Sequence, residues 1–200
     1  WQVYVCTGDA RQAITDDVLA LAAEGKAKKY EDYDYYPAKW SELHNSRRRR
    51  VGWGLYGLLG IEKGDREAMA KQGARNFKFF DAPVGLFITT DTYLSYGSWA
   101  DAGMYLQTIM LAARGLGLHT CPQAAWISFQ EPVFRHLGIP DDQVLVSGMS
   151  LGYADDSAIE NTLVSEREDV ANVAHFRGFY PSLAVGFTHV RRTVALFSYR

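Results

Sequence analysis

Hydrophobic and polar positions along the chain follow two different periods, one typical of strands and one typical of helices. Apolar runs at residues 1–5, 82–90 and 143–153 predict strands, and the second run is apolar at nearly every position, which is typical of a strand buried on both faces. Apolar residues at helical spacing predict helices over residues 8–25, 65–80, 98–115, 128–138 and 166–176. Strands separated by helices without a regular βαβ repeat indicate an α+β sheet domain.

Two segments depart from these simple patterns. The predicted helix 98–114 is apolar on nearly every side, so we expect it to lie in the middle of the molecule or of a dimer. Residues 26–60 fit neither period and carry seven aromatic residues among charges and glycines. A long aromatic segment without periodicity is typical of a lid or a binding loop, and we interpret 26–60 as a lid.

The lid contains a glycine pattern that imitates a nucleotide-binding motif. Residues 52–57 match G-x-G-x-x-G, but four arginines precede them where a strand is required, and Trp53 and Tyr56 fill positions that are normally small. We therefore reject a Rossmann turn. The arginines at 47–50 are interpreted as the solvated face of the lid, with contact to an anionic cosubstrate such as a nicotinamide dinucleotide phosphate as the alternative.

Composition narrows the function further. A formal net charge of −2 gives no basic field for nucleic acid, while an aromatic content of 14% favours a flat pocket or a subunit interface. The two cysteines and five histidines have no metal-ligand spacing, and Cys121 is expected to be a buried, inert thiol.

With no bilayer-length apolar stretch and no signal peptide, a cytoplasmic protein is expected. If the protein is an enzyme, we expect a cofactor to carry the chemistry.

Two connecting segments are candidates for ligand contact. Residues 115–126 contain glycines and Pro122, and we expect a loop there whose free amides bond a polar heterocycle; a purely structural connection is the alternative. In residues 161–168, Ser165 is expected to cap the last helix and Arg167 to project from its first turn. A phosphate there would satisfy the amides and the guanidinium, and a surface ion pair of Arg167 with Glu168 or Asp169 is the alternative.

Four runs of the sequence resemble the bacterial nitroreductase family, specifically its nitrobenzoate-reductase-like branch. They are RRRRVGWGLYGLLGI at 47–61, ARNFKFFDAPVGLF at 74–87, MLAARGLGLHTCPQAAW at 110–126 and GMSLGYAD at 148–155. The resemblance implies a nitroreductase-like fold in which helices flank a central, mainly antiparallel sheet, with two FMN molecules at the interface of a homodimer. It implies hydride transfer from NAD(P)H to the flavin and then to a nitroaromatic or quinone acceptor.

The resemblance also assigns roles to residues. The loop along the isoalloxazine ring would be Cys121, Pro122, Gln123 and Ala124. Arg167 would hold the FMN phosphate, the helix 98–114 would supply much of the dimer interface, and the substrate pocket would include Trp53, Tyr56 and Trp126. Hydride transfer needs no acid or base from the protein, so no catalytic residue is named.

The sequence departs from the family at both ends. Trp1 looks like the last residue of a family segment, so we expect that an N-terminal part, including an Arg-x-Ser-x-Arg phosphate-binding segment, is missing from a nitroreductase-like FMN domain over 1–179. Residues 180–200 are interpreted as an atypical tail, or alternatively as an ordinary last strand. Reductive dehalogenation or another flavin-reductase activity, and a non-catalytic remnant that binds FMN poorly, remain alternative functions.

Overall fold

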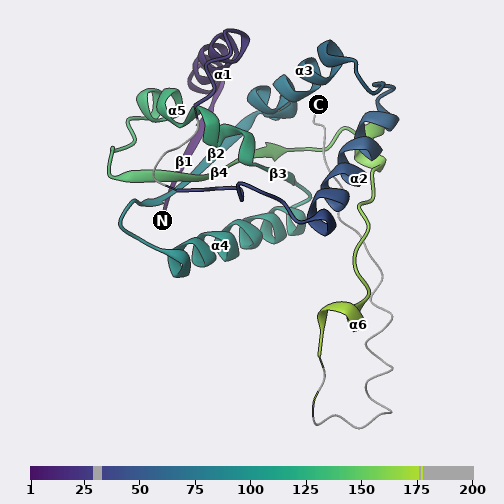
Figure 1. The fold of residues 1–200 in the computed structure, drawn as a ribbon. Coiled ribbons are helices and arrows are strands. Elements are labelled where there is room, and N and C mark those ends of the chain that lie inside the picture. Colours follow the sequence, from purple (N-terminus) through teal and green to yellow (C-terminus); the bar gives the residue numbers. More distant parts are fainter. Residues whose placement is uncertain (29–32, 176, 178–200) are drawn as a thin grey trace.

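A four-stranded sheet forms the centre of the fold in the computed structural model, which describes residues 1–28, 33–175 and 177 (Figure 1). Its strands are β1 (Gln2–Thr7), β2 (Val84–Asp91), β3 (His119–Gln123) and β4 (Gln143–Gly152), and they lie in the order β1-β2-β4-β3. Each neighbouring pair is antiparallel. The predicted α+β class with a mainly antiparallel sheet is confirmed, and the two predicted internal strands, β2 and β4, are its buried central pair.

Helices cover the two faces of this sheet. Helices α1 (Gly8–Ala23) and α5 (Gln130–Leu137) lie on one face, and α4 (Tyr96–Gly115) lies on the other (Figure 1). The alternation of side chains along β2 builds a core on each side: Phe87 joins the core under α1 and α5, while Leu86 and Ile88 join the core over α4.

The core under α1 and α5 is built from closely packed aromatic rings. Trp126 lies with its ring centroid 4.6 Å from that of Phe79 and 5.1 Å from that of Phe87. Two central-strand glycines make room for these rings, because a Cβ at Gly148 would lie 2.2 Å from Trp126 and one at Gly85 would lie 2.3 Å from Phe79. Phe79 has a left-handed φ of 54°, a strained conformation that its complete burial among these rings offsets.

Residues 26–60 contain a helix that the sequence pattern did not predict. α2 (Glu42–Leu58) begins after Ser41, whose hydroxyl accepts a hydrogen bond from the His44 amide, and it lies beyond the end of the sheet (Figure 1). None of its residues is buried, so no apolar stripe marks it in the sequence. The G-x-G-x-x-G pattern lies inside this helix, which confirms that it is not a Rossmann turn.

Several other predicted boundaries differ from the structure. The predicted helices at 98–115 and 128–138 begin elsewhere: α4 begins two residues before Ser98 and α5 two residues after Ser128, and neither N-cap residue makes a side-chain hydrogen bond. Gly138 ends α5 in the left-handed conformation, as predicted. The predicted helix 65–80 divides into α3 (Arg66–Ala74) and the 3-10 segment η1 (Arg75–Asp81).

The remaining elements bear on the candidate site. The predicted loop 115–126 contains the edge strand β3, followed by the 3-10 segment η2 (Ala124–Phe129). The predicted helix 166–176 is largely wrong: among the described residues after the 3-10 segment η3 (Ile159–Thr162), only α6 (Val170–Val173) is helical. The tail at 180–200 lies outside the described residues. Within the described part of the chain, no helix is long and apolar enough to cross a membrane.

Candidate functional site

Strand β3 places three of the predicted cofactor-binding residues on one edge of the sheet. Cys121, Pro122 and Gln123 pair with Ser150, Met149 and Gly148 of β4, and Ala124 opens the following 3-10 segment. Among the described residues, no strand pairs with the other side of β3. Proline, which has no N–H to donate, suits such an edge. Backbone polar groups on the open side of β3 form no hydrogen bonds with another strand, so they are available to bind a polar heterocycle.

The side chain of Gln123 is turned inward and does not face this edge. It is 2% exposed, accepts a hydrogen bond from Ser150 Oγ at 2.8 Å and donates one from Nε2 to the carbonyl oxygen of Asn76 at 2.7 Å. These bonds join β3 to β4 and to η1. Any contact of Gln123 with a cofactor therefore belongs to its backbone.

Cys121 is a buried thiol, as predicted. Burial raises its pKa to about 12, so the thiolate that a nucleophile or metal ligand requires is scarce at neutral pH. Cys6, the second free cysteine, is also buried, and burial raises its pKa to about 11. Among the described residues, no group of three or more His, Cys, Asp or Glu side chains could hold a metal ion.

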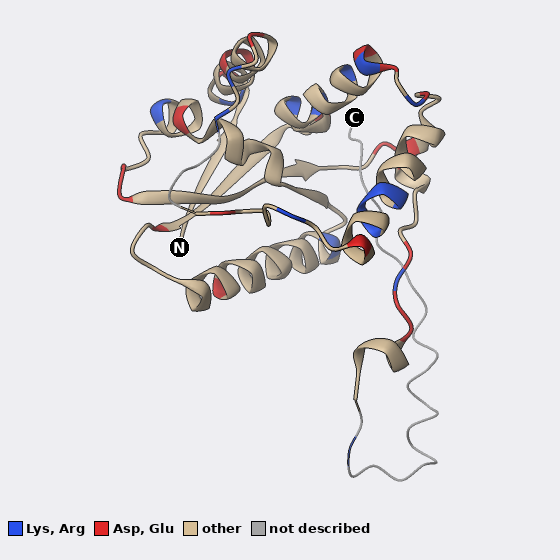
Figure 2. Ribbon diagram, viewed as in Figure 1, with Lys and Arg blue, Asp and Glu red and all other residues tan. Residues whose placement is uncertain are grey.

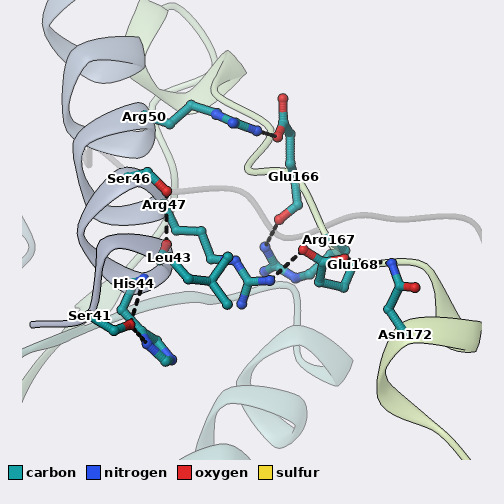
Figure 3. Close-up of polar contacts among 10 residues, drawn as sticks. All are labelled: Ser41, Leu43, His44, Ser46, Arg47, Arg50, Glu166, Arg167, Glu168 and Asn172. Atoms are coloured by element: carbon teal, nitrogen blue, oxygen red, sulfur yellow. Dashed lines mark hydrogen bonds and ion pairs between the residues drawn. The ribbon is translucent and has the colours of Figure 1, made fainter.

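Arg167 lies in the segment 165–169, before α6, and not in the first turn of a helix. Its Nη1 donates to Ser165 Oγ at 2.6 Å. The same nitrogen donates to the Glu166 carbonyl oxygen at 3.1 Å (Figure 3). Ser165 therefore contacts the guanidinium and does not cap a helix, and Asp169 caps α6 through the Ala171 amide. Arg167 is exposed.

The arginine run at 47–50 lies on α2 and faces the same segment. Arg47 forms an ion pair with Glu168, and Arg50 forms one with Glu166 (Figure 3). A hydrogen bond from Asn172 together with the charge of Arg47 lowers the pKa of Glu168. Figure 2 shows this gathering of basic residues on α2 beside the acidic segment. Arg48, between them, lies over the ring of Trp40, 5.2 Å from its centroid. Three of the four arginines are thus engaged within the protein and are not simply a solvated face.

The three predicted pocket residues divide into two groups. Trp53 and Tyr56 lie together on α2 with ring centroids 5.7 Å apart in an edge-on arrangement, and Trp53 is 41% exposed. Trp126, by contrast, is completely buried among Phe77, Phe79 and Phe87. Trp126 therefore packs in the core beneath η2. Its contact with a substrate stays a prediction, and this packing does not favour it.

Sequence reasoning missed the partners of these residues. Glu168 was considered only as an ion-pair partner of Arg167, and Glu166 was not considered, although two glutamates on either side of Arg167 and the basic run at 47–50 carry complementary charges. Asn76 was missed because its backbone carbonyl, not its side chain, receives Gln123. An open cavity of about 1120 Å³ lies elsewhere, between residues 26–28 and α5, and none of the predicted site residues lines it.

Comparison with known proteins places this arrangement in a family. The model of the nitroreductase family matches residues 1–153. The chain is 40% identical over 190 residues to a 4-nitrobenzoate reductase of Pseudomonas putida, covering 90% of this chain and 78% of the relative.

Solved structures agree with this relationship. The crystal structure of an FMN- and NADPH-dependent nitroreductase, NfnB from sphigopyxis sp. strain HMH, matches with a TM-score of 0.85 and 37% identity, covering 90% of this chain and 80% of the other. An FMN-dependent NfnB from Mycobacterium smegmatis, solved in complex with NADPH, matches with a TM-score of 0.82 and 28% identity, covering 88% and 78%. The chain therefore belongs to the nitroreductase family.

Proposed function

We propose that this protein is an FMN- and NADPH-dependent oxidoreductase that reduces nitroaromatic compounds, with quinones as further acceptors. The observation that carries the proposal is the likeness, over nine tenths of the chain, to a solved nitroreductase that depends on both FMN and NADPH. The relatives reported above are reductases of nitroaromatic compounds, which favours nitro reduction over reductive dehalogenation.

The residues present fit a flavin at the edge of the sheet. The unpaired edge of β3 over residues 121–124 offers backbone donors and acceptors to the rim of a heterocycle, and the exposed guanidinium of Arg167 offers donors to a phosphate. A bound FMN would supply the hydride-transfer chemistry between NADPH and the acceptor, which amino-acid side chains do not supply. The protein then contributes binding and orientation, and we name no acid or base.

Trp53 and Tyr56 are proposed to contact the acceptor. Their edge-on rings present an aromatic surface on α2, and exposed aromatic side chains recognise flat, electron-poor rings such as nitroaromatics through stacking. Substrate contact by Trp126 would require a rearrangement of the core, so we leave it out of this pocket.

A homodimer is proposed to complete the site. The side of α4 that faces away from the sheet exposes Met104 (61%) and Leu111 (65%), whereas Ala102 and Ala113 on the same helix are buried. An exposed apolar helix face of this kind is typical of a subunit interface. A flavin site shared between two chains would also explain why no predicted site residue lines the open cavity beside α5.

The visible absorbance spectrum of the purified chain tests this function. We expect added FMN to be retained after excess is removed, NADPH to bleach it without oxygen, and 4-nitrobenzoate to restore the oxidised spectrum. R167A should weaken FMN binding roughly 10- to 150-fold, which is the loss in affinity expected when a hydrogen bond to a charged group is removed. R66A, on the exposed start of α3, should leave FMN binding unchanged. If FMN is not retained at any concentration tested, the non-catalytic remnant is the better interpretation; retained FMN that NADPH does not bleach would reject the oxidoreductase.

A further inference from the structure

Two ion pairs join α2 to the segment that carries Arg167. Arg47 and Arg50, three residues apart, lie on one face of the helix, and their partners Glu168 and Glu166 stand on either side of Arg167 (Figure 3). We call these four residues the arginine–glutamate clamp. Because the pairing residues are separated by more than a hundred positions in the sequence, the clamp is a tertiary contact and not a local one.

The clamp changes the charge that surrounds Arg167. Segment 165–169 contains three carboxylates and one guanidinium, so on its own it would repel an anion. Arg47 and Arg50 offset Glu168 and Glu166, and Asp169 is turned to the N-terminus of α6. The guanidinium of Arg167 is then free to act on an anion without two uncompensated carboxylates beside it.

A close packing contact supports the same junction. Gly54 lies one turn after Arg50 on the same face of α2, and a Cβ there would stand 3.2 Å from Leu163 Cδ1. Trp53 and Tyr56 project from the same helix. Since a helix moves as a rigid element, its position against 163–168 also sets the position of these two rings.

We propose that Arg47 and Arg50 are positioning residues: they neutralise the carboxylates flanking Arg167 and hold α2 against its segment, so that the phosphate end of the flavin site and the helix bearing Trp53 and Tyr56 form one unit. The phosphate part of this inference rests on the proposed function. The holding of α2 does not, because it concerns contacts within the chain alone.

The experiment compares the wild-type chain with three variants. R47E/R50E places like charges against both glutamates, and R47E/R50E/E166R/E168R restores opposite charges in the reverse order. R48E/R49E is the matched control, because it makes the same change of charge on the same helix without touching Glu166 or Glu168. Two quantities are measured: hydrogen exchange of the α2 amides in the chain without FMN, and the Kd for FMN from quenching of flavin fluorescence.

We expect R47E/R50E to accelerate exchange in α2 and to weaken FMN binding, each by about 2- to 30-fold, the range for two exposed ion pairs. The charge-swapped variant should return both quantities to within about threefold of the wild type. R48E/R49E removes only the contact of Arg48 with the Trp40 ring, so it should accelerate exchange less and weaken FMN binding less than R47E/R50E does.

The two proposals fail in different ways. Equal effects of R47E/R50E and R48E/R49E on both quantities would overturn the clamp while FMN binding by the wild type still supports the proposed function. No FMN binding by the wild type would reject the proposed function, and the exchange data would then decide whether the clamp holds α2. In that case unchanged exchange in R47E/R50E overturns the clamp, and faster exchange that the swap corrects supports it.

Discussion

Ser150 and Gln123 are joined by a hydrogen bond inside the protein, at the pairing of β4 with the edge strand β3. The serine hydroxyl donates to the amide oxygen at 2.8 Å, and the amide nitrogen donates onward to the carbonyl of Asn76. Ser150 is fully buried and Gln123 nearly so. These hydrogen bonds hold β3, the strand that we propose contacts the flavin, against β4 and η1, so that its exposed edge keeps a defined position.

Removing the amide of Gln123 should destabilise the protein. Q123L removes the hydrogen bond from the buried Ser150 hydroxyl and the one to the carbonyl oxygen of the half-buried Asn76, and each loss costs about 1–3 kcal/mol of unfolding free energy. Urea denaturation measures this loss, with Q72L on α3 as the control at a residue outside the network. Equal stability of Q123L and the wild type would mean that the network contributes nothing.

Gly148 is required by the indole ring of Trp126. G148A should lower the unfolding free energy by at least about 1–3 kcal/mol, because its Cβ would lie 2.2 Å from Trp126 Cδ1 in a close-packed core. G73A is the matched control: Gly73 is exposed in α3, nothing lies within 4 Å of its Cβ, and alanine there should stabilise by up to about 1 kcal/mol. Thermal denaturation of both variants should give shifts of opposite sign.

Both cysteines should be unreactive in the folded protein. Burial raises the pKa of Cys121 to about 12 and that of Cys6 to about 11, so at pH 8 the thiolate fraction is very small and access is blocked. We expect a chromogenic disulfide reagent to titrate two thiols rapidly in urea and neither of them rapidly in buffer. A fast reaction of one thiol in buffer would show that its strand opens.

Stability should fall as the pH drops below about 6.5 because of His119. Burial, together with the nearby Arg114, lowers the pKa of His119 below the ordinary 6.5, so just below pH 6.5 the unfolded chain binds a proton that the folded chain does not. This contribution is complete above pH 6.5 and is lost as the pH falls toward the lower, folded value.

The variant H119N separates this effect from other titrations. Asparagine keeps an acceptor for the Ala154 amide, which donates to His119 Nδ1 at 3.2 Å, and it does not titrate. Chemical denaturation at pH 7.5 and 5.5 should show a smaller loss for H119N than for the wild type. Glu131 and Glu168 do not interfere, because their pKa values lie below the ordinary 4.5. Equal losses would remove His119 as the cause.

A charge on the outer face of α4 should separate the proposed dimer. L111E would bury an unpaired carboxylate in the proposed interface, and the free energy of removing this charge from water would exceed what the apolar contacts of the interface supply. Light scattering after size exclusion should give twice 22.4 kDa for the wild type and 22.4 kDa for L111E. The control is A13E on the exposed side of α1, which should remain a dimer. A wild-type monomer would contradict the dimer.

The sequence was most informative where one segment determines its own structure. β2 and β4 were predicted because their apolar runs are nearly continuous. The end of α5 was predicted because the helical pattern stops at Gly138, which adopts the left-handed conformation that ends the helix. β3 was missed because its five residues include His119 and Pro122 and show no alternation; pairing with β4 makes it a strand. α2 was missed because none of its residues is buried.

The candidate site depended on contacts between distant segments. The Ser165 pattern predicted a helix, but Glu166 and Glu168 instead face Arg50 and Arg47, a pairing that local sequence does not encode. Trp126 was assigned to the substrate pocket from the family resemblance, and its neighbours in the core became visible only in three dimensions. The roles of residues 121–124 and Arg167 came from family resemblance and remain predictions.

Pro122 has a consequence for how the protein behaves before it binds anything. An open strand edge is the part of a sheet most prone to join the edge of another copy and begin aggregation. The proline in the middle of β3 interrupts the row of donors that such growth needs, and the strand is only five residues long. Newly made chains can therefore keep this edge open for a small molecule without offering it as a template to one another.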